Sequence, residues 1–176
     1  MILPILSALL GIIAFLPMNA YPVAFIFLIP LFLFFAEEQK LWRLILGTAF
    51  FQLIFLSGTV YFTLDPILWI EVILIFLGLP MAVWVIKKFS VRFLPSISAS
   101  CLLLILLPFI FTFFDHLQAR FALIPTYIMT AGNALGSSPF IGLAGTGGLI
   151  MLTFFVAVIN VLIAAAILQR ENRRNI

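Results

Sequence analysis

Charge is scarce in this 176-residue chain, because only 9% of its residues are Asp, Glu, Lys or Arg. A soluble domain carries about 25% charged residues and roughly 45 to 50% apolar ones. Here hydrophobic residues make up 65% of the chain, and 21 residues are Phe. This composition excludes a soluble domain. It predicts an all-α integral membrane protein, since apolar runs separated by short charged segments suit helices that cross a hydrocarbon core of about 30 Å.

Cysteine and histidine are also nearly absent, with one residue of each. A single cysteine excludes an intramolecular disulfide and a multi-cysteine metal site. Cys101 lies within SASCLLLILL, where we expect it to be a small packing residue. No Ser-His-Asp arrangement or carboxylate pair follows from the spacing. The sequence therefore predicts no catalytic residue, no metal and no cofactor.

The apolar runs predict one polytopic membrane domain over residues 1–176 with about six transmembrane helices. The first run has no Lys or Arg before its apolar core, and Met18 and Ala20 make a poor cleavage site, so we expect a retained helix and not a signal peptide. Pro30, Pro80 and Pro108 are expected to kink their helices. The predicted spans are 2–17, 21–36, 42–64, 67–86, 93–114 and 146–168, with an outer interfacial segment over 115–145.

The positive charges predict the orientation of these spans. With six spans and a cytoplasmic N-terminus, eight of the nine Lys and Arg residues fall on the cytoplasmic side and only Arg120 falls outside, as the positive-inside rule requires. Both termini are thus predicted to be cytoplasmic. Because the basic residues are dispersed among loops, nucleic acid is excluded as a partner. The eight are Lys40, Arg43, Lys87, Lys88, Arg92, Arg170, Arg173 and Arg174.

The outer segment from Asp115 to Pro139 contains the only histidine. In a helical turn His116 and Arg120 are neighbours at a spacing of four. Two interpretations remain open. Asp115, His116 and Arg120 could bind a lipid head group, with Arg120 on the phosphate, or the segment could lie along the outer leaflet with its charges in water.

Uncharged polar residues and glycines mark helix contacts. Glycine-rich GLAGTGG, residues 142–148, has neither the preceding strand nor the Lys-Ser/Thr pair of a phosphate loop. We expect it to form a turn into the membrane and to allow close helix packing. Within the spans, four polar residues are predicted to form interhelical hydrogen bonds: Gln52, Thr59, Thr153 and Asn160.

Three blocks of sequence are similar to the N-terminal membrane region of bacterial apolipoprotein N-acyltransferases. PFIGLAGTGGLIMLTFFVAVINVLIAAAI resembles its last part, FLPMNAYPVAFIFLIPLFLF its first loop and second helix, and LGTAFFQLIFLSGTVYF its third helix. FDHLQARFALIPT departs from the family's Glu-x-Leu-Arg-Gly and Phe-Pro-Trp runs, offering Gln118 or Arg120 for the arginine and Thr126 for the tryptophan. The matching positions are Pro17, Tyr21, Pro22, Gly47, Gly58, Asp115, Pro125, Pro139, Gly148 and Asn160.

The resemblance implies a role in lipoprotein biosynthesis at the bacterial cytoplasmic membrane. Those enzymes pass an acyl chain from a phospholipid through a cysteine thioester to a lipoprotein, using a Glu-Lys-Cys triad in a nitrilase-like domain that follows a further helix. This chain ends at QRENRRNI, before such a helix. We therefore expect a stand-alone homologue of the membrane domain that binds phospholipid or acts as a scaffold and has no acyltransferase activity alone.

Its expected partners are membrane phospholipids and either a separately encoded nitrilase-like subunit or a lipoprotein. Two alternatives remain. One is a truncated, inactive acyltransferase. The other is a small lipid or solute carrier, which would be expected to show an internal repeat and polar residues at mid-membrane depth.

Overall fold

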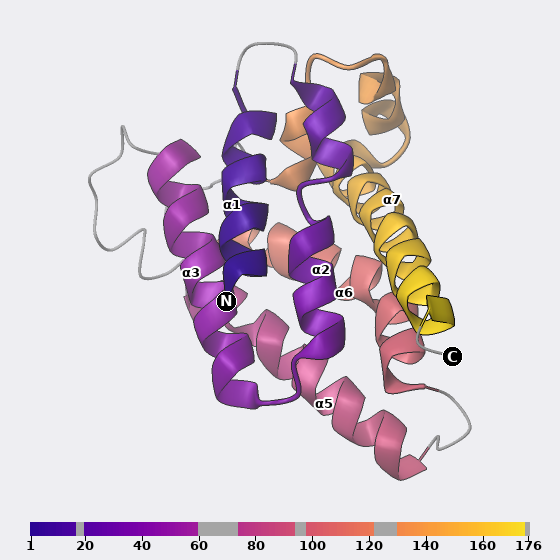
Figure 1. The fold of residues 1–176 in the computed structure, drawn as a ribbon. Helices are drawn as coiled ribbons and strands as arrows, with labels where there is room; N and C mark the ends of the chain where they lie inside the picture. The colour runs from indigo at the N-terminus through magenta and orange to yellow at the C-terminus, as the bar shows by residue number, and fades with distance from the viewer. Residues whose placement is uncertain (17–19, 60–73, 94–97, 122–129, 175–176) are drawn as a thin grey trace.

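The computed structural model describes residues 1–16, 20–59, 74–93, 98–121 and 130–174, and every regular element in these ranges is helical (Figure 1). The predicted all-helical class is therefore confirmed. The elements are α1 (Ile2–Ala14), η1 (Tyr21–Phe25), α2 (Ile29–Glu37), α3 (Leu41–Thr59), α5 (Gly78–Phe93), α6 (Ala99–Phe121), η3 (Ala131–Leu135), η4 (Pro139–Leu143) and α7 (Ala144–Arg174).

Four helical stretches within the described ranges are long and apolar enough to cross a membrane: Leu41–Thr59, Leu74–Phe93, Ala99–Arg120 and Pro139–Arg170. Each contains most of one predicted span. The stretches that correspond to the first two predicted spans, Ile2–Ala14 and Tyr21–Glu37, are shorter. The count of six spans and the orientation of the termini therefore stay predictions.

Small residues let α1 lie close to its neighbours. The buried face of α1 carries Ser7, Ala8, Gly11 and Ala14. A Cβ atom on Gly11 would stand 2.9 Å from a ring carbon of Phe55 on α3, which is closer than side-chain atoms normally approach. Without bulky side chains at this contact, van der Waals packing can hold the two helices together in an apolar solvent.

The predicted span 21–36 is not one helix, because η1 and α2 are separated by a break. Asn160 of α7 bridges this break: its Oδ1 accepts from Leu28 N at 2.9 Å, and its Nδ2 donates to Ala24 O at 2.9 Å. Pro30 lies in the first turn of α2, where a missing N–H costs no helical bond. We had expected Pro30 to kink its helix, and this was wrong: Pro30 begins the helix α2.

The helix α5 continues to Phe93, beyond the predicted end at residue 86, and so carries basic residues within it. Lys87 is only 3% exposed. Its Nζ donates to Ala36 O at 2.9 Å and to Glu38 O at 2.7 Å, which are carbonyls at the end of α2. Lys87 was predicted as a loop charge, but it caps a neighbouring helix whose last carbonyls have no partner of their own.

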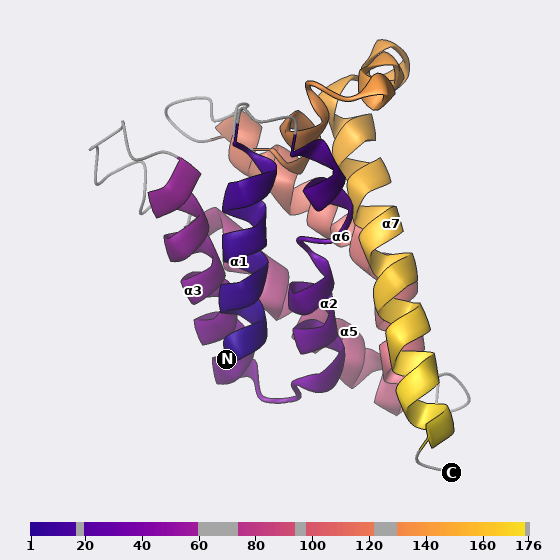
Figure 2. The same ribbon diagram turned by 45° about the horizontal axis from the view of Figure 1, so that its top comes forward.

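The two long helices α6 and α7 pack side by side and run in opposite directions (Figures 1 and 2). The fifth span was predicted to end at residue 114, yet α6 continues to Phe121. The first residues of the predicted outer segment 115–145 are therefore helical. The charge of Asp115 does not end the helix because its side chain is buried and hydrogen-bonded.

The bundle has two distinct ends. We call the end with the last turns of α2, α5 and α7 the basic end, because Lys40, Arg43, Lys88, Arg92 and Arg170 lie there, and the opposite end, with η3 and η4, the η end (Figure 2). Ser100 at the start of α6 donates to Ala36 O at 3.4 Å, which joins α6 to the basic end. Arg120 lies in the last turn of α6, at the η end.

The bonds of Asn160 predict a measurable contribution to stability. In Asn160→Ala, Leu28 N and Ala24 O lose their partner within the membrane-spanning bundle, so we expect a loss of about 1 to 3 kcal/mol of unfolding free energy. Thermal unfolding of the purified chain in detergent measures this. The control is Ser57→Ala, whose hydroxyl is exposed and bonds only Ile54 O in its own helix. Equal melting of the two variants would contradict the assigned role.

Candidate functional site

A polar cavity of about 250 Å³ lies at the η end, where α6 and α7 meet η3. Most of its exposed surface is apolar, but hydroxyl, carboxyl and imidazole groups belong to the side chains that line it. We call it the polar cavity. It is lined by Thr112, Asp115, His116, Thr130, Gly147, Gly148, Leu149, Ile150 and Thr153.

Asp115 is the centre of this cavity and is only 5% exposed. Its Oδ2 accepts from the Ala131 N–H at 3.1 Å and from the Thr153 hydroxyl at 3.0 Å. Thr153 Oγ1 in turn accepts from the Gly132 N–H at 3.0 Å. Because buried polar groups need such partners, this network fixes η3 between α6 and α7.

The close approach of η3 to α7 depends on Gly132. A Cβ atom at this position would stand 2.7 Å from Leu149 O and 2.9 Å from Thr153 N, which are both backbone atoms. Backbone atoms cannot move aside as a flexible side chain can. Glycine at position 132 therefore brings the η3 backbone within hydrogen-bonding distance of Thr153.

Two glycines of GLAGTGG, Gly147 and Gly148, line the cavity. Gly147 and Gly148 leave helical geometry, and Gly148 has a φ of 66°, a left-handed conformation that favours glycine. The structure thus shows a turn at this place, while its entry into the membrane stays a prediction. The predicted close packing is wrong for Gly142, Gly145 and Gly148, because added Cβ atoms there would meet nothing within 4 Å. The turn, and not helix packing, is what requires glycine here.

Thr112 brings an unused hydrogen-bonding group to the cavity. It is 6% exposed, and its Oγ1 has no hydrogen-bond partner among the described residues. It lies one helical turn before Asp115 on the same face of α6. A buried hydroxyl without a partner costs free energy, and a ligand reaches this oxygen only after the side chain turns, because the atom is covered by the protein.

The three predicted head-group contacts do not all come together. Asp115 and the half-buried His116 both line the polar cavity. Arg120 is exposed and is not part of the lining. Asp115 was expected at the membrane surface, but the donors of η3 and α7 bury it. Sequence reasoning missed Thr112, Thr130 and Gly132; the helical spacing of Thr112 to Asp115 was a usable signal for the first.

The polar cavity continues into an apolar groove between α6 and α7. This short groove has a volume of about 390 Å³, and it shares Thr112, Gly147 and Ile150 with the polar cavity. Its other walls are Phe109, Phe113, Met151 and Phe154. A cavity lined by a few polar side chains that adjoins an apolar groove suits an amphiphile with a small polar part.

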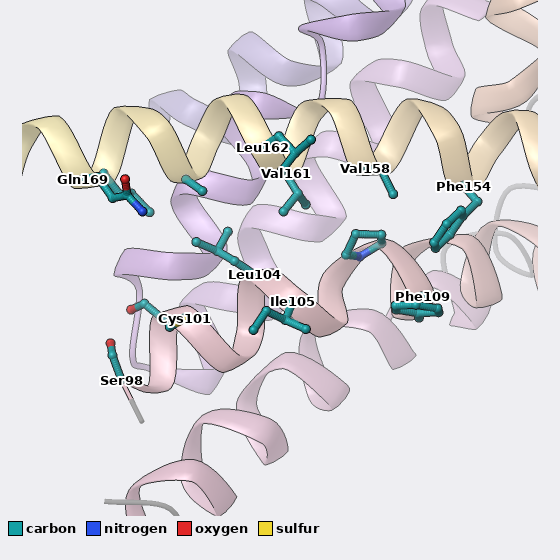
Figure 3. A pocket seen from close by; sticks show the side chains of 14 residues that line it. Ser98, Cys101, Leu104, Ile105, Phe109, Phe154, Val158, Val161, Leu162 and Gln169 are labelled. Atoms are coloured by element: carbon teal, nitrogen blue, oxygen red, sulfur yellow. The ribbon is translucent and has the colours of Figure 1, made fainter. Parts of the chain in front are cut away.

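A second, longer groove follows α6 and α7 toward the basic end (Figure 3). This long groove has a volume of about 480 Å³ and meets the short groove at Phe109 and Phe154, whose ring centroids are 4.9 Å apart. Cys101 lines the long groove and is exposed. Our expectation of a packing residue is therefore wrong for Cys101, since it faces the surface of the bundle.

Comparison with known proteins agrees with this helical architecture. A sequence model of the apolipoprotein N-acyltransferase N-terminal domain family matches residues 7–162. The chain belongs to this family. No curated protein and no solved structure matches it.

The apolipoprotein N-acyltransferase positions that the structure describes serve the backbone. Tyr21 and Pro22 begin η1, and Pro139 begins η4. Gly148 makes the turn before the regular part of α7, and Asn160 bridges the break in the second span. These residues hold the N-acyltransferase membrane fold. None of these five residues lines either groove, and only Gly148 lines the polar cavity.

Two further N-acyltransferase positions are close-contact glycines. A Cβ on Gly47 would stand 2.5 Å from the ring of Phe34, and one on Gly58 would stand 2.2 Å from the side chain of Ile12. Both glycines therefore let α3 pack against neighbouring helices. Pro17 and Pro125 lie outside the described residues.

The described residues contain no group of three or more His, Cys, Asp or Glu side chains that could hold a metal ion. Within these same ranges the single cysteine and the single histidine occupy different pockets, since Cys101 lines the long groove and His116 the polar cavity.

Gly132→Ala tests the close contact under the cavity. The added methyl would overlap Leu149 O and Thr153 N, and overpacking of this kind costs about 1 to 3 kcal/mol. We expect thermal unfolding at a lower temperature than in the matched variant Gly145→Ala, where the added methyl meets open space. If Gly132→Ala melted together with Gly145→Ala and the parent chain, the close approach of η3 to α7 would be wrong.

Proposed function

We propose that the chain is a non-catalytic, phospholipid-binding membrane module of the apolipoprotein N-acyltransferase family. The observation that supports this is the continuity of the polar cavity with the short groove through Thr112, Gly147 and Ile150. In this proposal the polar part of a phospholipid enters the cavity, and the start of an acyl chain lies between Phe109 and Phe113 of α6 and Met151 of α7.

The chemistry of the cavity suits the ester and head-group region of a lipid. Asp115 supplies a carboxyl group whose Oδ2 is already oriented by Ala131 and Thr153. The Thr112 hydroxyl lacks a protein partner among the described residues, and it can donate to an ester or phosphate oxygen. The His116 side chain lies at the same wall and can bond a further polar atom.

The membrane orientation forms part of the proposal. If the basic end is cytoplasmic, as the positive-inside rule predicts, the polar cavity opens toward the outer leaflet of a bacterial cytoplasmic membrane. The chain is then a multi-pass protein with both termini inside. This is the face at which the resemblance to lipoprotein N-acylation implies that the reaction occurs.

Catalysis is assigned to a partner in this proposal. Within residues 1–176 the only thiol is that of Cys101, which faces the long groove at the opposite end from Asp115 and His116. A separately encoded nitrilase-like subunit would supply the nucleophile, and this module would present the lipid to it. A carrier function is less well supported, because the ring contact of Phe109 with Phe154 separates the two grooves.

Acyl transfer from a labelled phospholipid to a diacylglyceryl-lipopeptide tests the role as a subunit. The purified chain is assayed alone and together with a nitrilase-like subunit from the same genome. We expect product only in the mixture. Product from the chain alone would contradict the non-catalytic assignment. If neither sample formed product and the subunit was shown to be folded, the proposed role of that partner would be wrong.

Thr112→Val tests the lipid site by itself, because valine keeps the shape and removes the hydroxyl. We expect about fivefold weaker retention of phospholipid, as one hydrogen bond is worth about 1 kcal/mol. Native mass spectrometry of the purified chain measures the retained lipid. Thr112→Ser should restore it, and Thr146→Val, whose exposed hydroxyl bonds only Leu143 O, should match the parent. Unchanged retention in Thr112→Val would rule out this contact.

A further inference from the structure

The long groove lies outside the site described so far, and its lining changes character along its length. Side chains from α6 and α7 face each other across it, with Leu104 and Ile105 opposite Val158 and Leu162 (Figure 3). Phe109 and Phe154 stand at one end, and Ser98 and Gln169 at the other. The groove is therefore apolar in its middle, closed by rings at one end and polar at the other.

The length of the groove matches one leaflet of a bilayer. From Ser98 to Phe109 the chain advances eleven positions along α6, which at 1.5 Å per residue is about 16 Å. Half of a hydrocarbon core of about 30 Å is about 15 Å. The rings of Phe109 and Phe154, 4.9 Å apart, thus close the groove at about the depth that one acyl chain reaches from its mouth. One acyl chain from the leaflet at the basic end fits this depth.

The polar mouth lies in a positively charged region. Gln169 is exposed, and the exposed Arg170 follows it directly on α7. Lys88 and Arg92 of α5 are exposed at the same end of the bundle. Basic groups beside a groove between transmembrane helices favour anionic lipid head groups.

Glu37 and Glu38, two acidic residues at the basic end, do not oppose this assignment. Glu38 lies 3.5 Å from Arg43 in an ion pair, and the Lys40 N–H that it accepts helps to hold its pKa below the usual range. Its negative charge is therefore already compensated. Glu37 and Glu38 are both absent from the lining of the long groove.

We propose that the long groove holds one acyl chain of an anionic phospholipid from the leaflet at the basic end. Its phosphate lies at the mouth, beside Ser98, Gln169 and Arg170. This site is separate from the polar cavity, which lies beyond the ring pair at the other end of α6 and α7. The lipid bound here is a structural ligand that fills the groove, and it is not the lipid of the proposed function.

The only cysteine provides a local probe, because Cys101 is exposed and lines the groove. The full chain is placed in nanodiscs of phosphatidylcholine with or without phosphatidylglycerol, and the rate of alkylation by an uncharged maleimide is measured. We expect phosphatidylglycerol to slow the alkylation of Cys101 about fivefold. Arg170→Gln should remove most of this difference, since one basic residue near an anionic surface contributes about that factor.

A matched control separates filling of the groove from a general effect of lipid charge. In the double variant Cys101→Ser, Leu46→Cys, the thiol stands on an exposed face of α3, and its alkylation should be the same in both bilayers. Equal rates for Cys101 in both bilayers would overturn the proposal. So would an equal slowing at position 46, because the effect would then come from the surface charge alone.

Native mass spectrometry gives a second, independent measurement. From an equal mixture of the two lipids we expect the parent chain to retain phosphatidylglycerol in preference to phosphatidylcholine. Leu162→Trp, which fills the groove, should lose that preference, and Leu46→Trp on α3 should keep it. Alkylation of Cys101 that is blocked in native membranes but free in phosphatidylglycerol nanodiscs would show a protein segment in the groove and would overturn the lipid assignment.

Discussion

The structure depends on one constraint: a backbone group inside a bilayer must find its hydrogen-bond partner within the protein. Two of the described segments that are not α-helix are the break between η1 and α2 and the short η3. Both obtain partners from α7, through Asn160 and Thr153. These residues are seven positions apart, which is about two helical turns. One face of α7 therefore supplies the missing partners for both irregular segments.

The grooves are lined by another side of α7, which carries apolar residues. Phe154, Val158 and Leu162 are spaced by four and form a stripe that faces α6 across the grooves. The residues of this stripe are apolar and lie at the surface of the bundle. Thr153 and Asn160 on one side of α7 bond the irregular segments, and the apolar stripe on another side lines the grooves.

Much of the fold could be predicted from the sequence, because its signals are local. Long apolar runs mark α3, α6 and α7, and the interior polar residues Thr153 and Asn160 do form interhelical bonds. Among the described residues, the Thr59 hydroxyl bonds Phe55 O of its own helix and no other helix, so that prediction was wrong for it there. Gln52 is buried, and its Oε1 has no partner among the described residues. Polarity within a span shows that a partner is needed and not where that partner lies.

The candidate site was harder to predict because its contacts are distant in the sequence. Asp115 follows an apolar run, and a charge at that place is ordinarily a helix boundary. Its donors are Ala131, sixteen residues later, and Thr153, thirty-eight residues later. Lys87 was mistaken for a loop residue for the same reason, since the carbonyls that it caps belong to α2. Only the packed arrangement shows that these charges are inside the bundle.

The same geometry keeps the thiol and the imidazole of the described residues apart. Cys101 and His116 lie on one continuous helix, and fifteen residues at 1.5 Å each place them about 22 Å apart along its axis. A thiol needs a base within hydrogen-bonding distance to become a nucleophile, and a rigid helix cannot bring these two together. Within α6 these two groups therefore do not form a nucleophile and base pair, whereas the polar cavity and the grooves lie between α6 and α7.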